Sequence, residues 1–238
     1  MDCIRSAVIL AGGRGRRIGG EKAFMEFFGK TMIERAVEGA RKVAEDVIVV
    51  ARDGSQAERI REMALEVRVV PDLVSNYGPV AGLASGMACA EGELALAIGC
   101  DLPFLNPGLL DRLFCLAKGH DAAIPLREDG VMERLHAVYR ADLMAKACNK
   151  AIVRGCHRIA SPLNDLDVKL VPTGWLRSVD PELLSFFNIN TEKDLVEARR
   201  IWLALDVVLE KSVDDVGYYG KQGDLENQAS ECQEEYGD

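Results

Sequence analysis

The most constraining feature of this chain is a short apolar run that breaks directly into glycines and then into cations. Residues 7–10 read Ala-Val-Ile-Leu without polar alternation, which predicts a strand that is buried on both faces. Gly12 and Gly13 follow almost at once. Glycines directly after such a strand let the backbone turn tightly and approach a ligand with no Cβ in the way. The run therefore predicts the first strand of an α/β sheet, with a ligand-binding loop at its carboxyl end.

The loop that follows is rich in cations, although the formal net charge of the whole chain is −9. The cations are Arg14, Arg16, Arg17 and Lys22. An acidic chain lacks the basic footprint of a general nucleic-acid binder, so we expect no nucleic-acid partner. Arginine forks bind phosphate oxygens bidentately, so the cluster favours a small polyanion such as a nucleoside triphosphate. A basic surface loop without a ligand is the alternative interpretation.

Two common phosphate-binding patterns do not match this loop. The P-loop requires G-x-x-x-x-G-K-[ST]; Gly15 and Gly20 have the right separation, but Glu21 follows them. The dinucleotide fingerprint requires G-x-G-x-x-G, and Ile18 stands where its third glycine is needed. A phosphate site here must therefore be of another kind.

Composition and cysteine usage indicate an ordinary globular protein. The 238 residues are 48% hydrophobic and 28% charged, enough to bury a sizeable core. The seven cysteines are scattered and form no CxxC pair, which predicts neither a zinc site nor a redox dithiol and favours a reducing compartment. The N-terminus has no signal pattern, and no apolar run approaches the roughly 18 residues of a membrane span. We therefore expect a cytoplasmic location and no membrane partner.

Helical and strand patterns alternate over the next part of the chain. Thr31 and Glu34 have capping-box spacing, which predicts the start of a helix. Ser55 and Glu58 have the same spacing and predict a second helix, to about residue 65. Strands are expected at residues 46–51, 67–70 and 94–100. This alternation predicts an α/β fold of three layers, with a mostly parallel central sheet joined by right-handed crossovers.

Residues 76–86 form a glycine-rich segment with two interpretations. Pro79 suits the first turn of a helix, whose free N–H groups and partial positive charge favour an anion. Gly82 and Gly86 lie four apart and leave room on one helical face for a close approach. That approach fits a ligand or tight packing of the helix on the sheet, and the sequence does not separate the two.

An aspartate follows the strand expected at residues 94–100. A carboxylate at the carboxyl end of a buried parallel strand points into the crevice where open α/β sheets bind ligands. Burying an ionised carboxylate there costs free energy unless it is paired with a cation or bound to a metal. Mg²⁺ is a metal that such a carboxylate binds, together with substrate phosphates. Asp101 is therefore a candidate Mg²⁺ ligand; capping of a turn before Pro103 is the alternative. Asn106 followed by Pro107 then predicts the start of a helix.

The pattern changes after about residue 120. Strands are expected at residues 122–125, 135–139, 168–171 and 186–190, and helices at 141–152 and after Thr191. Basic residues gather at 154–158, where another helix could start. We expect one domain over residues 1–210, with a nucleotide-binding part at 1–120 and an acceptor-binding part at 121–210. Residues 211–238 are acidic and polar, which predicts a disordered tail.

Taken in order, these stretches resemble the molybdenum cofactor guanylyltransferase (MobA) family of nucleotidyltransferases, which share a glycosyltransferase-A-like, Rossmann-like fold. The resemblance spans about residues 6–205. It rests on Leu-Ala-Gly-Gly at 10–13 with Arg-Ile-Gly at 17–19 and Lys22, Gly-Pro-Val-Ala-Gly at 78–82, Asp-Leu-Pro at 101–103, Leu-His-Ala-Val-Tyr at 135–139 and Phe-Phe-Asn-Ile-Asn-Thr at 186–191.

The resemblance implies Mg²⁺-dependent transfer of GMP from GTP to the phosphate of molybdopterin, which gives the guanine dinucleotide cofactor and pyrophosphate. It also implies contact with molybdoenzyme-maturation proteins. A related transferase with CTP, or with a phospho-hydroxyacid, cobinamide phosphate or sugar 1-phosphate as acceptor, is the nearest alternative. A regulatory or scaffold protein on a degenerate transferase fold is a third, but Lys22 and Asp101 together argue against mere binding.

The same resemblance implies roles for individual residues. The nucleotide-binding set is Leu10, Ala11, Gly12, Gly13, Arg14, Lys22, Asp72, Gly82 and Asp101. The catalytic set is Arg17, Lys22 and Asp101, with Asp101 as the metal ligand, and the acceptor-binding set is Arg158, Asn188 and Asn190. His136, in an apolar strand, is expected to be a packed core residue. His157 is a candidate for holding an anionic pterin phosphate, with a solvated basic face as the alternative.

Overall fold

The computed structural model describes residues 4–13, 15, 20–74 and 77–215. The chain divides into two compact units, residues 1–194 and residues 195–238. The first unit contains the sheet and every cavity discussed below. Helix α6 (Glu192–Asp215) continues through the first five residues of the expected tail. The single domain over residues 1–210 stays a prediction.

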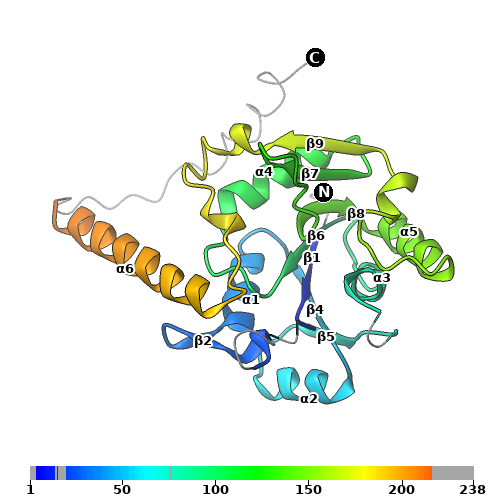
Figure 1. Cartoon of the computed structure of the whole chain (residues 1–238), viewed down its shortest axis with the longest axis horizontal. Helices are drawn as coiled ribbons and strands as arrows, with labels where there is room; N and C mark the ends of the chain where they lie inside the picture. The colour runs from blue at the N-terminus through cyan, green and yellow to red at the C-terminus, as the bar shows by residue number, and fades with distance from the viewer. Residues whose placement is uncertain (1–3, 14, 16–19, 75–76, 216–238) are drawn as a thin grey trace. The chain divides into compact units, whose positions relative to one another are not determined.

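A seven-stranded sheet forms the centre of the first unit (Figure 1). Its order is β5-β4-β1-β6-β8-β7-β9. The strands are β1 (Arg5–Leu10), β4 (Asp46–Ala51), β5 (Arg68–Pro71), β6 (Leu94–Gly99), β7 (Ala122–Leu126), β8 (His136–Arg140) and β9 (Val168–Pro172). β8 runs antiparallel to its neighbours β6 and β7, whereas the other pairings are parallel. The predicted α/β class with a mostly parallel sheet is confirmed.

The direction of the crossovers reverses at β1. The chain first adds β4 and β5 on one side of β1 and then places β6 on the other side. Leu10, at the end of β1, pairs with Val50 of β4 and with Gly99 of β6. The residues that follow these three strands therefore meet at one edge of the sheet. In open α/β sheets, this reversal point is where ligands bind.

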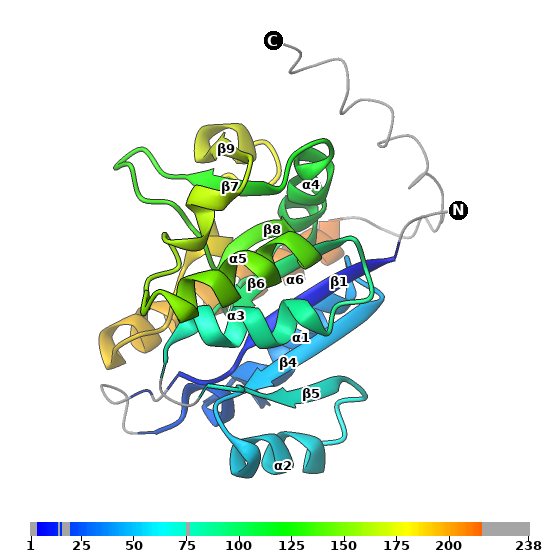
Figure 2. The same cartoon turned by 90° about the vertical axis from the view of Figure 1, so that its right-hand side faces the viewer.

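Helices cover both faces of the sheet, as Figures 1 and 2 show. They are α1 (Met32–Arg41), α2 (Gly54–Glu62), α3 (Pro79–Ala88), α4 (Pro107–Ala117) and α5 (Ala141–Val153). α1, α2 and α4 pack their apolar residues on one face, whereas α3 and α5 pack on the other. A two-stranded hairpin of β2 (Glu26–Phe27) and β3 (Lys30–Thr31) precedes α1. None of the helices that the structure describes has the length and apolar character that a membrane span requires.

Of the helix caps expected at Thr31, Ser55 and Asn106, two are confirmed and one is wrong. Thr31 and Glu34 form the capping box of α1, and the side chain of Asn106 accepts hydrogen bonds from the first turn of α4. α2 is capped by Asp53 rather than Ser55, because the Asp53 carboxylate accepts from the backbone N–H of Gln56 at 2.8 Å. A carboxylate also stabilises the positive end of the helix dipole. α2 ends at Glu62, before the expected residue 65.

Two expectations for the second half are wrong. Residues 186–190 are not a strand: a 3₁₀ helix at Leu184–Phe186 leads into irregular chain, whose Ile189 N–H donates to the Asp101 carbonyl at 3.0 Å. Residues 154–158 do not start a helix, because the chain turns at Gly155 (φ +72°) before a 3₁₀ helix at Pro162–Asp165. The irregular segment is therefore held by the chain that follows β6, not by a strand ladder.

α3 lies very close to the sheet at its glycines. A Cβ on Gly86 would lie 2.8 Å from Val50 Cγ2 and would also collide with Val8. A Cβ on Gly82 would lie 3.2 Å from Leu10 Cδ2. Both glycines therefore allow tight packing of the helix on the sheet. The two interpretations of this segment are compatible, because Gly82 also borders the cavity described next.

Candidate active site

A cavity of about 730 Å³ lies at the carboxyl edge of β1, β4, β5 and β6. It is lined by Leu10, Gly12, Gly13, Lys22, Val50, Ala51, Arg52, Asp72, Gly78, Pro79, Gly82, Gly99, Cys100, Asp101 and Leu135. The glycine loop and Asp101, which are far apart in the chain, thus face the same space. Most of the residues expected to bind a nucleotide lie around this one cavity.

Lys22, Asp101 and Asn190 form a polar cluster at this cavity. Lys22 Nζ lies 2.7 Å from Asp101 Oδ2 and 2.5 Å from Asn190 Oδ1. The side chains of Lys22 and Asp101 are 12% and 23% exposed, so both charges are largely removed from water. A charge in such a place must be paired, and each of the two satisfies the other.

The backbone around Asp101 turns its carboxylate into the cavity. A Cβ on Gly99 would lie 2.5 Å from Asp101 Oδ1, so glycine leaves the room that the carboxylate occupies. The Cys100 N–H donates to the Leu10 carbonyl at 3.2 Å, and the Asp101 carbonyl accepts from Ile189. This hydrogen bond fixes Ile189, and with it the neighbouring residues Asn188 and Asn190, next to Asp101.

The described part of the glycine loop folds back over Lys22. Gly15 has φ +52°, a conformation that favours glycine, and its Cβ would collide with the Gly20 carbonyl. Gly13 leaves room for the Lys22 stem, 3.6 Å from the position of its absent Cβ. Arg14 and Arg17, expected to contact the triphosphate, lie outside the described residues, as do Arg16, Ile18 and Gly19.

Ala11 differs from its neighbours Leu10 and Gly12, which border the cavity. Ala11 is fully buried, its N–H donates to the Val50 carbonyl at 2.9 Å, and its carbonyl accepts from Gln56 Nε2 at 3.2 Å. Its backbone groups therefore already have partners in the protein. Its expected contact with a nucleotide stays a prediction.

Arg52 is a cavity residue that the sequence reasoning missed. It directly follows β4, and its guanidinium donates to Glu21 Oε1 at 3.1 Å and to Asp53 Oδ2 at 2.9 Å. Glu21 also accepts from Gln56 Nε2 at 3.0 Å and from Arg59 Nη1 at 3.3 Å. Glu21 therefore joins the glycine loop to α2 and orients Arg52. The rule that ligand residues follow parallel strands could have identified Arg52.

Asp72 borders the cavity at the end of β5. Its N–H donates to the Ala51 carbonyl at 2.7 Å, and its carboxylate accepts from the Val74 N–H at 3.1 Å. Burial raises the pKa of Asp72 above its ordinary value. The structure thus places this predicted nucleotide-contacting residue at the cavity.

The start of α3 forms another wall. Gly78 (φ +96°) and Pro79 border the cavity, so the free N–H groups of the first turn lie at its rim. The His157 ring stacks on Tyr77 with centroids 4.0 Å apart, and Nδ1 lies 3.1 Å from the Tyr77 carbonyl. His157 is therefore beside this rim, whereas the exposed Arg158 is not among the lining residues.

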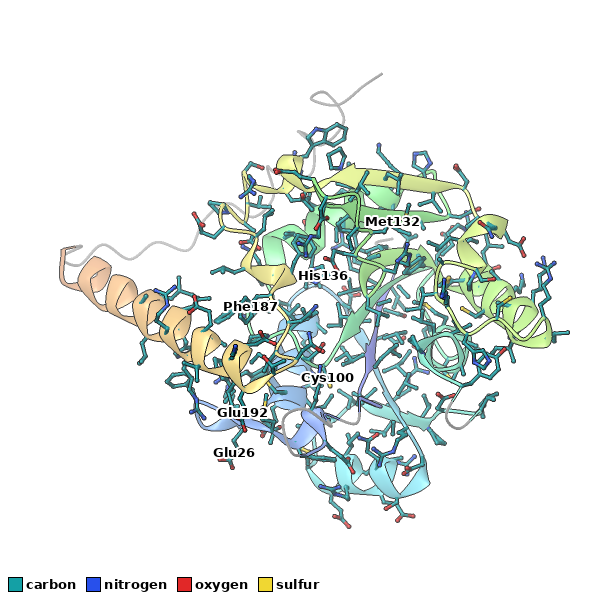
Figure 3. The ribbon with its side chains drawn as sticks, viewed as in Figure 1. Glu26, Cys100, Met132, His136, Phe187 and Glu192 are labelled. Carbon is teal, nitrogen blue, oxygen red and sulfur yellow. The ribbon has the colours of Figure 1, made fainter. Side chains whose placement is uncertain are left out.

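Cys100 and Leu135 also line the cavity, although the sequence did not indicate them as site residues. Cys100 is buried, which raises the pKa of its thiol to about 12 and keeps it protonated. His136 is 1% exposed, so its prediction as a buried residue is confirmed. Burial lowers the pKa of His136 to about 3, so the ring is neutral near pH 7. Figure 3 labels Cys100 and His136 at this edge of the sheet.

Oxygen atoms suited to a hard cation are present at this site. In the chain as described, no group of three or more His, Cys, Asp or Glu side chains could hold a metal ion. Mg²⁺ does not require such a cage, because it keeps several waters and binds one or two carboxylates plus substrate phosphates. The Asp101 carboxylate at the cavity, with the Asn190 amide oxygen nearby, fits that donor set.

Comparison with known proteins agrees with this geometry. Residues 7–170 match the MobA-like NTP transferase domain family. A probable molybdenum cofactor guanylyltransferase from Methanosarcina mazei is 41% identical over 198 residues, which are 80% of this chain and 88% of the relative. A molybdenum cofactor guanylyltransferase from Desulfosudis oleivorans is 33% identical over 204 residues, 83% and 95% of the two chains.

Solved structures show the same fold. The crystal structure of molybdopterin-guanine dinucleotide biosynthesis protein A from Archaeoglobus fulgidus has a TM-score of 0.74 and 34% identity, and covers 84% of this chain and 99% of its own. 4-Diphosphocytidyl-2C-methyl-D-erythritolsynthase from Anaerococcus prevotii, at 16% identity and a TM-score of 0.63 over 84% and 99%, shares the fold. The cavity lies where the crossovers change direction, which is the ligand-binding place of open α/β sheets. The family match, the similar relatives and the shared fold together show that the chain belongs to the MobA family of MobA-like NTP transferases and is a nucleotidyltransferase.

Proposed function

We propose that the protein transfers GMP from GTP to the phosphate of molybdopterin, with Mg²⁺ bound, and releases pyrophosphate. The observation that carries this proposal is the convergence of Lys22 and Asp101 in one cavity. The named activity of the relatives, molybdenum cofactor guanylyltransferase, supports the choice of GTP and of molybdopterin.

The cavity is suited to a nucleoside triphosphate. Its volume of about 730 Å³ lies within the range of about 300–1,000 Å³ that is usual for small-molecule sites. Leu10, Gly12 and Gly13 offer backbone at the end of β1, and Lys22 and Arg52 offer positive charge. We assign the phosphates to these cations and to Arg14 and Arg17, and a nucleoside contact to Asp72.

Asp101 is the residue that would hold Mg²⁺. When bound, the ion would neutralise charge on the triphosphate oxygens and polarise the α-phosphate. The pairing of Asp101 with Lys22 is compatible with this role, because a triphosphate offers Lys22 other anionic partners. The site would then contain the carboxylate, the ion and the ammonium around one polyanion.

The reaction needs positioning and charge neutralisation more than a nucleophilic side chain. An oxygen of the acceptor phosphate attacks the α-phosphorus, a new P–O bond forms, and the bond to pyrophosphate breaks. A phosphate monoester has its second pKa at about 6, so the acceptor is ionised near pH 7 and needs no general base. Burial keeps the Cys100 thiol protonated and lowers the pKa of His136 to about 3, so the thiol is a poor nucleophile and the ring a weak base, which agrees with this chemistry.

We place the acceptor beside residues 188–190, the segment that is hydrogen-bonded to the Asp101 carbonyl through Ile189. Asn188 and Asn190 flank Ile189, whose N–H donates to the Asp101 carbonyl. Asn190 also accepts from Lys22, so it can position the ammonium between the two substrates. We propose Asn188, Asn190 and the exposed Arg158 as acceptor-binding residues, and a cytoplasmic location, which buried thiols such as Cys100 and Cys148 support.

Pyrophosphate release tests the proposal. The protein is incubated with Mg²⁺, one nucleoside triphosphate and one acceptor at a time. The panel comprises GTP, CTP and ATP against molybdopterin, molybdenum cofactor, a phospho-hydroxyacid, cobinamide phosphate and sugar 1-phosphates. We expect turnover with GTP and molybdopterin, and loss of turnover when EDTA removes the metal. Turnover with sugar 1-phosphates alone would exclude the cofactor reaction, and no turnover with any pair would favour a nucleotide-binding protein.

A further inference from the structure

The buried ring of His136 lacks a hydrogen-bonding partner among the residues that the structure describes. Both Nδ1 and Nε2 are buried without a partner. His136 begins β8 and pairs with Ile98 of β6, so it lies at the edge of the sheet where Cys100 and Asp101 follow β6; Figure 3 labels His136 and Cys100 there. Buried polar groups are nearly always hydrogen-bonded, because an unsatisfied one loses its bonds to water without replacement. Both ring nitrogens are therefore free to form a hydrogen bond with water or with a ligand.

His136 lines a small cavity next to the proposed active site. This cavity has a volume of about 120 Å³. Gly99, Asp101 and Leu135 border both it and the larger cavity, so the two spaces adjoin across these residues. Since a water molecule takes about 30 Å³ of liquid, the small cavity has room for several water-sized groups or for the edge of a ring.

We propose that this small cavity is a subsite for the acceptor, and that His136 forms a hydrogen bond there with a neutral, N–H-bearing edge of a heteroaromatic ring. The proposal rests on the proposed function, which puts the acceptor beside Asp101. It adds a recognition residue, His136, and the kind of chemical group that this residue binds.

The side chains around the cavity favour a neutral group with N–H donors over an anion. The carboxylates of Asp101 and Glu133 both border it, and they would repel a phosphate but accept N–H donors. Glu133 retains acceptor capacity, because its contact with Arg127 is made by Oε1 at 3.3 Å. The Asn188 amide and the neutral imidazole can each donate and accept. An aminopyrimidinone edge, such as that of a pterin, alternates donors and acceptors in a matching way.

An aromatic wall completes the subsite. The Phe186 ring lies 4.7 Å from the His136 ring, centroid to centroid, at an interplanar angle of 59°. Phe186 also borders a groove of about 450 Å³ that is lined in addition by Arg127 and Thr173. Because the small cavity adjoins the larger one at Gly99, Asp101 and Leu135, an acceptor whose ring edge lies against His136 and Phe186 can extend from there toward the nucleotide, where its phosphate reacts.

Substitution of His136 tests the subsite in the full-length protein. His136→Leu introduces an apolar side chain of similar size that cannot form hydrogen bonds, whereas His136→Gln keeps a donor and an acceptor. We expect His136→Leu to raise the KM for molybdopterin by about tenfold, the loss expected for one hydrogen bond, while the KM for GTP stays within about twofold. His136→Gln should recover part of that loss.

The matched controls are chosen from the same chain. His120→Leu removes a histidine that contacts Asp167 and lies at another cavity, so both KM values should be unchanged. Glu133→Gln, an isosteric change in the small cavity, should raise the KM for molybdopterin, and it keeps the test valid if His136→Leu fails to fold. An unchanged KM for molybdopterin in both cavity variants would overturn the proposal. A parallel rise in both KM values without recovery in His136→Gln would show a structural role and also overturn it.

Direct binding separates this inference from the proposed function. Quenching of 6-hydroxymethylpterin fluorescence reports binding of the ring alone. If molybdopterin is not turned over, but the wild type quenches the pterin and His136→Leu does not, the proposed reaction fails and the subsite stands. If molybdopterin is turned over and its KM ignores both cavity variants, the reaction stands and the subsite fails. Neither turnover nor quenching would overturn both.

Discussion

The Lys22 ammonium lies 2.7 Å from the Asp101 carboxylate, although the two residues are separated by 79 positions in the chain. Lys22 is positioned by the glycine loop and Asp101 by the end of β6, so the pair fixes the loop to the sheet. Both groups are well suited to bind a triphosphate with its metal. The contact therefore stabilises the site through the same two charged groups that a triphosphate and its metal would contact.

Replacement of Asp101 should abolish transfer and leave the fold intact. We expect both Asp101→Ala and the isosteric Asp101→Asn to lower kcat by roughly 10³ or more, because the proposed metal loses its carboxylate. Pyrophosphate release measures the rate, and circular dichroism with a thermal melt measures the fold. Wild-type turnover in either variant would mean that the metal site lies elsewhere.

Lys22 and Asn190 should act as a unit. Because Asn190 Oδ1 accepts from Lys22 Nζ at 2.5 Å, we expect Asn190 to act mainly through the lysine. Lys22→Ala should lower kcat/KM for GTP more than Asn190→Ala does. In a double-mutant cycle, the two losses should deviate from additivity by about 0.5–3 kcal/mol. Simple additivity would show that the amide and the ammonium act separately.

Glu21 should affect nucleotide binding without touching the nucleotide. Glu21→Ala removes the acceptor that orients Arg52 at the cavity wall, so we expect the KM for GTP to rise by about three- to tenfold. Arg59→Ala is the matched control, because Arg59 contacts the same Glu21 oxygen but is half exposed and does not border the cavity. An equal effect of the two substitutions would contradict this role for Arg52.

Gly86 should tolerate no larger residue. In Gly86→Ala, the new methyl group would meet Val8 and lie 2.8 Å from Val50 Cγ2. Overpacking of this kind costs about 1–3 kcal/mol, against about 1 kcal/mol gained from helix propensity. We therefore expect a net loss in urea unfolding. Gly54→Ala is the control, because nothing lies within 4 Å of its absent Cβ; a loss of the same size there would argue against a packing effect.

His136 should make the fold sensitive to acid. Burial lowers its pKa to about 3, whereas an unfolded histidine titrates near about 6.5. Between these values the unfolded chain binds a proton that the folded chain does not. The free energy of unfolding therefore falls with decreasing pH, by up to about 1.4 kcal/mol per unit.

The matching measurement is urea unfolding of the wild type and His136→Leu from pH 7 to pH 4. The leucine variant cannot take up this proton, so its stability relative to the wild type should increase as the pH falls. A difference that stays constant across the range would mean that the ring takes up its proton as readily in the folded protein as in the unfolded chain.

Local signals in the sequence located many elements of the fold. The Thr31–Glu34 pair and the Asn106–Pro107 pair are short-range patterns, and both begin helices where expected. Ser55 and Glu58 have the same spacing, but the Asp53 carboxylate caps the helix two residues earlier. A spacing rule compares two positions at a time, so it does not weigh a stronger cap nearby.

Long-range partners limited the rest of the prediction. Residues 186–190 have strand composition, yet Ile189 bonds to the chain after β6 and no strand forms there. The reversal of β8 is equally invisible, because apolar alternation does not encode strand direction. Asn190 and Lys22, 168 positions apart, meet only because of the fold. Arg52 could have been found from its place after a parallel strand.

β8 differs from its neighbours in which of its ends lies at the edge of the sheet that borders the two cavities. β1, β4, β5 and β6 deliver their ends there, but the antiparallel β8 delivers its beginning, with Leu135 and His136. The connection from β7, residues 127–135, therefore borders the small cavity through Glu133 and Leu135, and Leu135 also borders the larger cavity. If the proposed function holds, exchange of this connection between relatives is a direct route to new acceptor preferences.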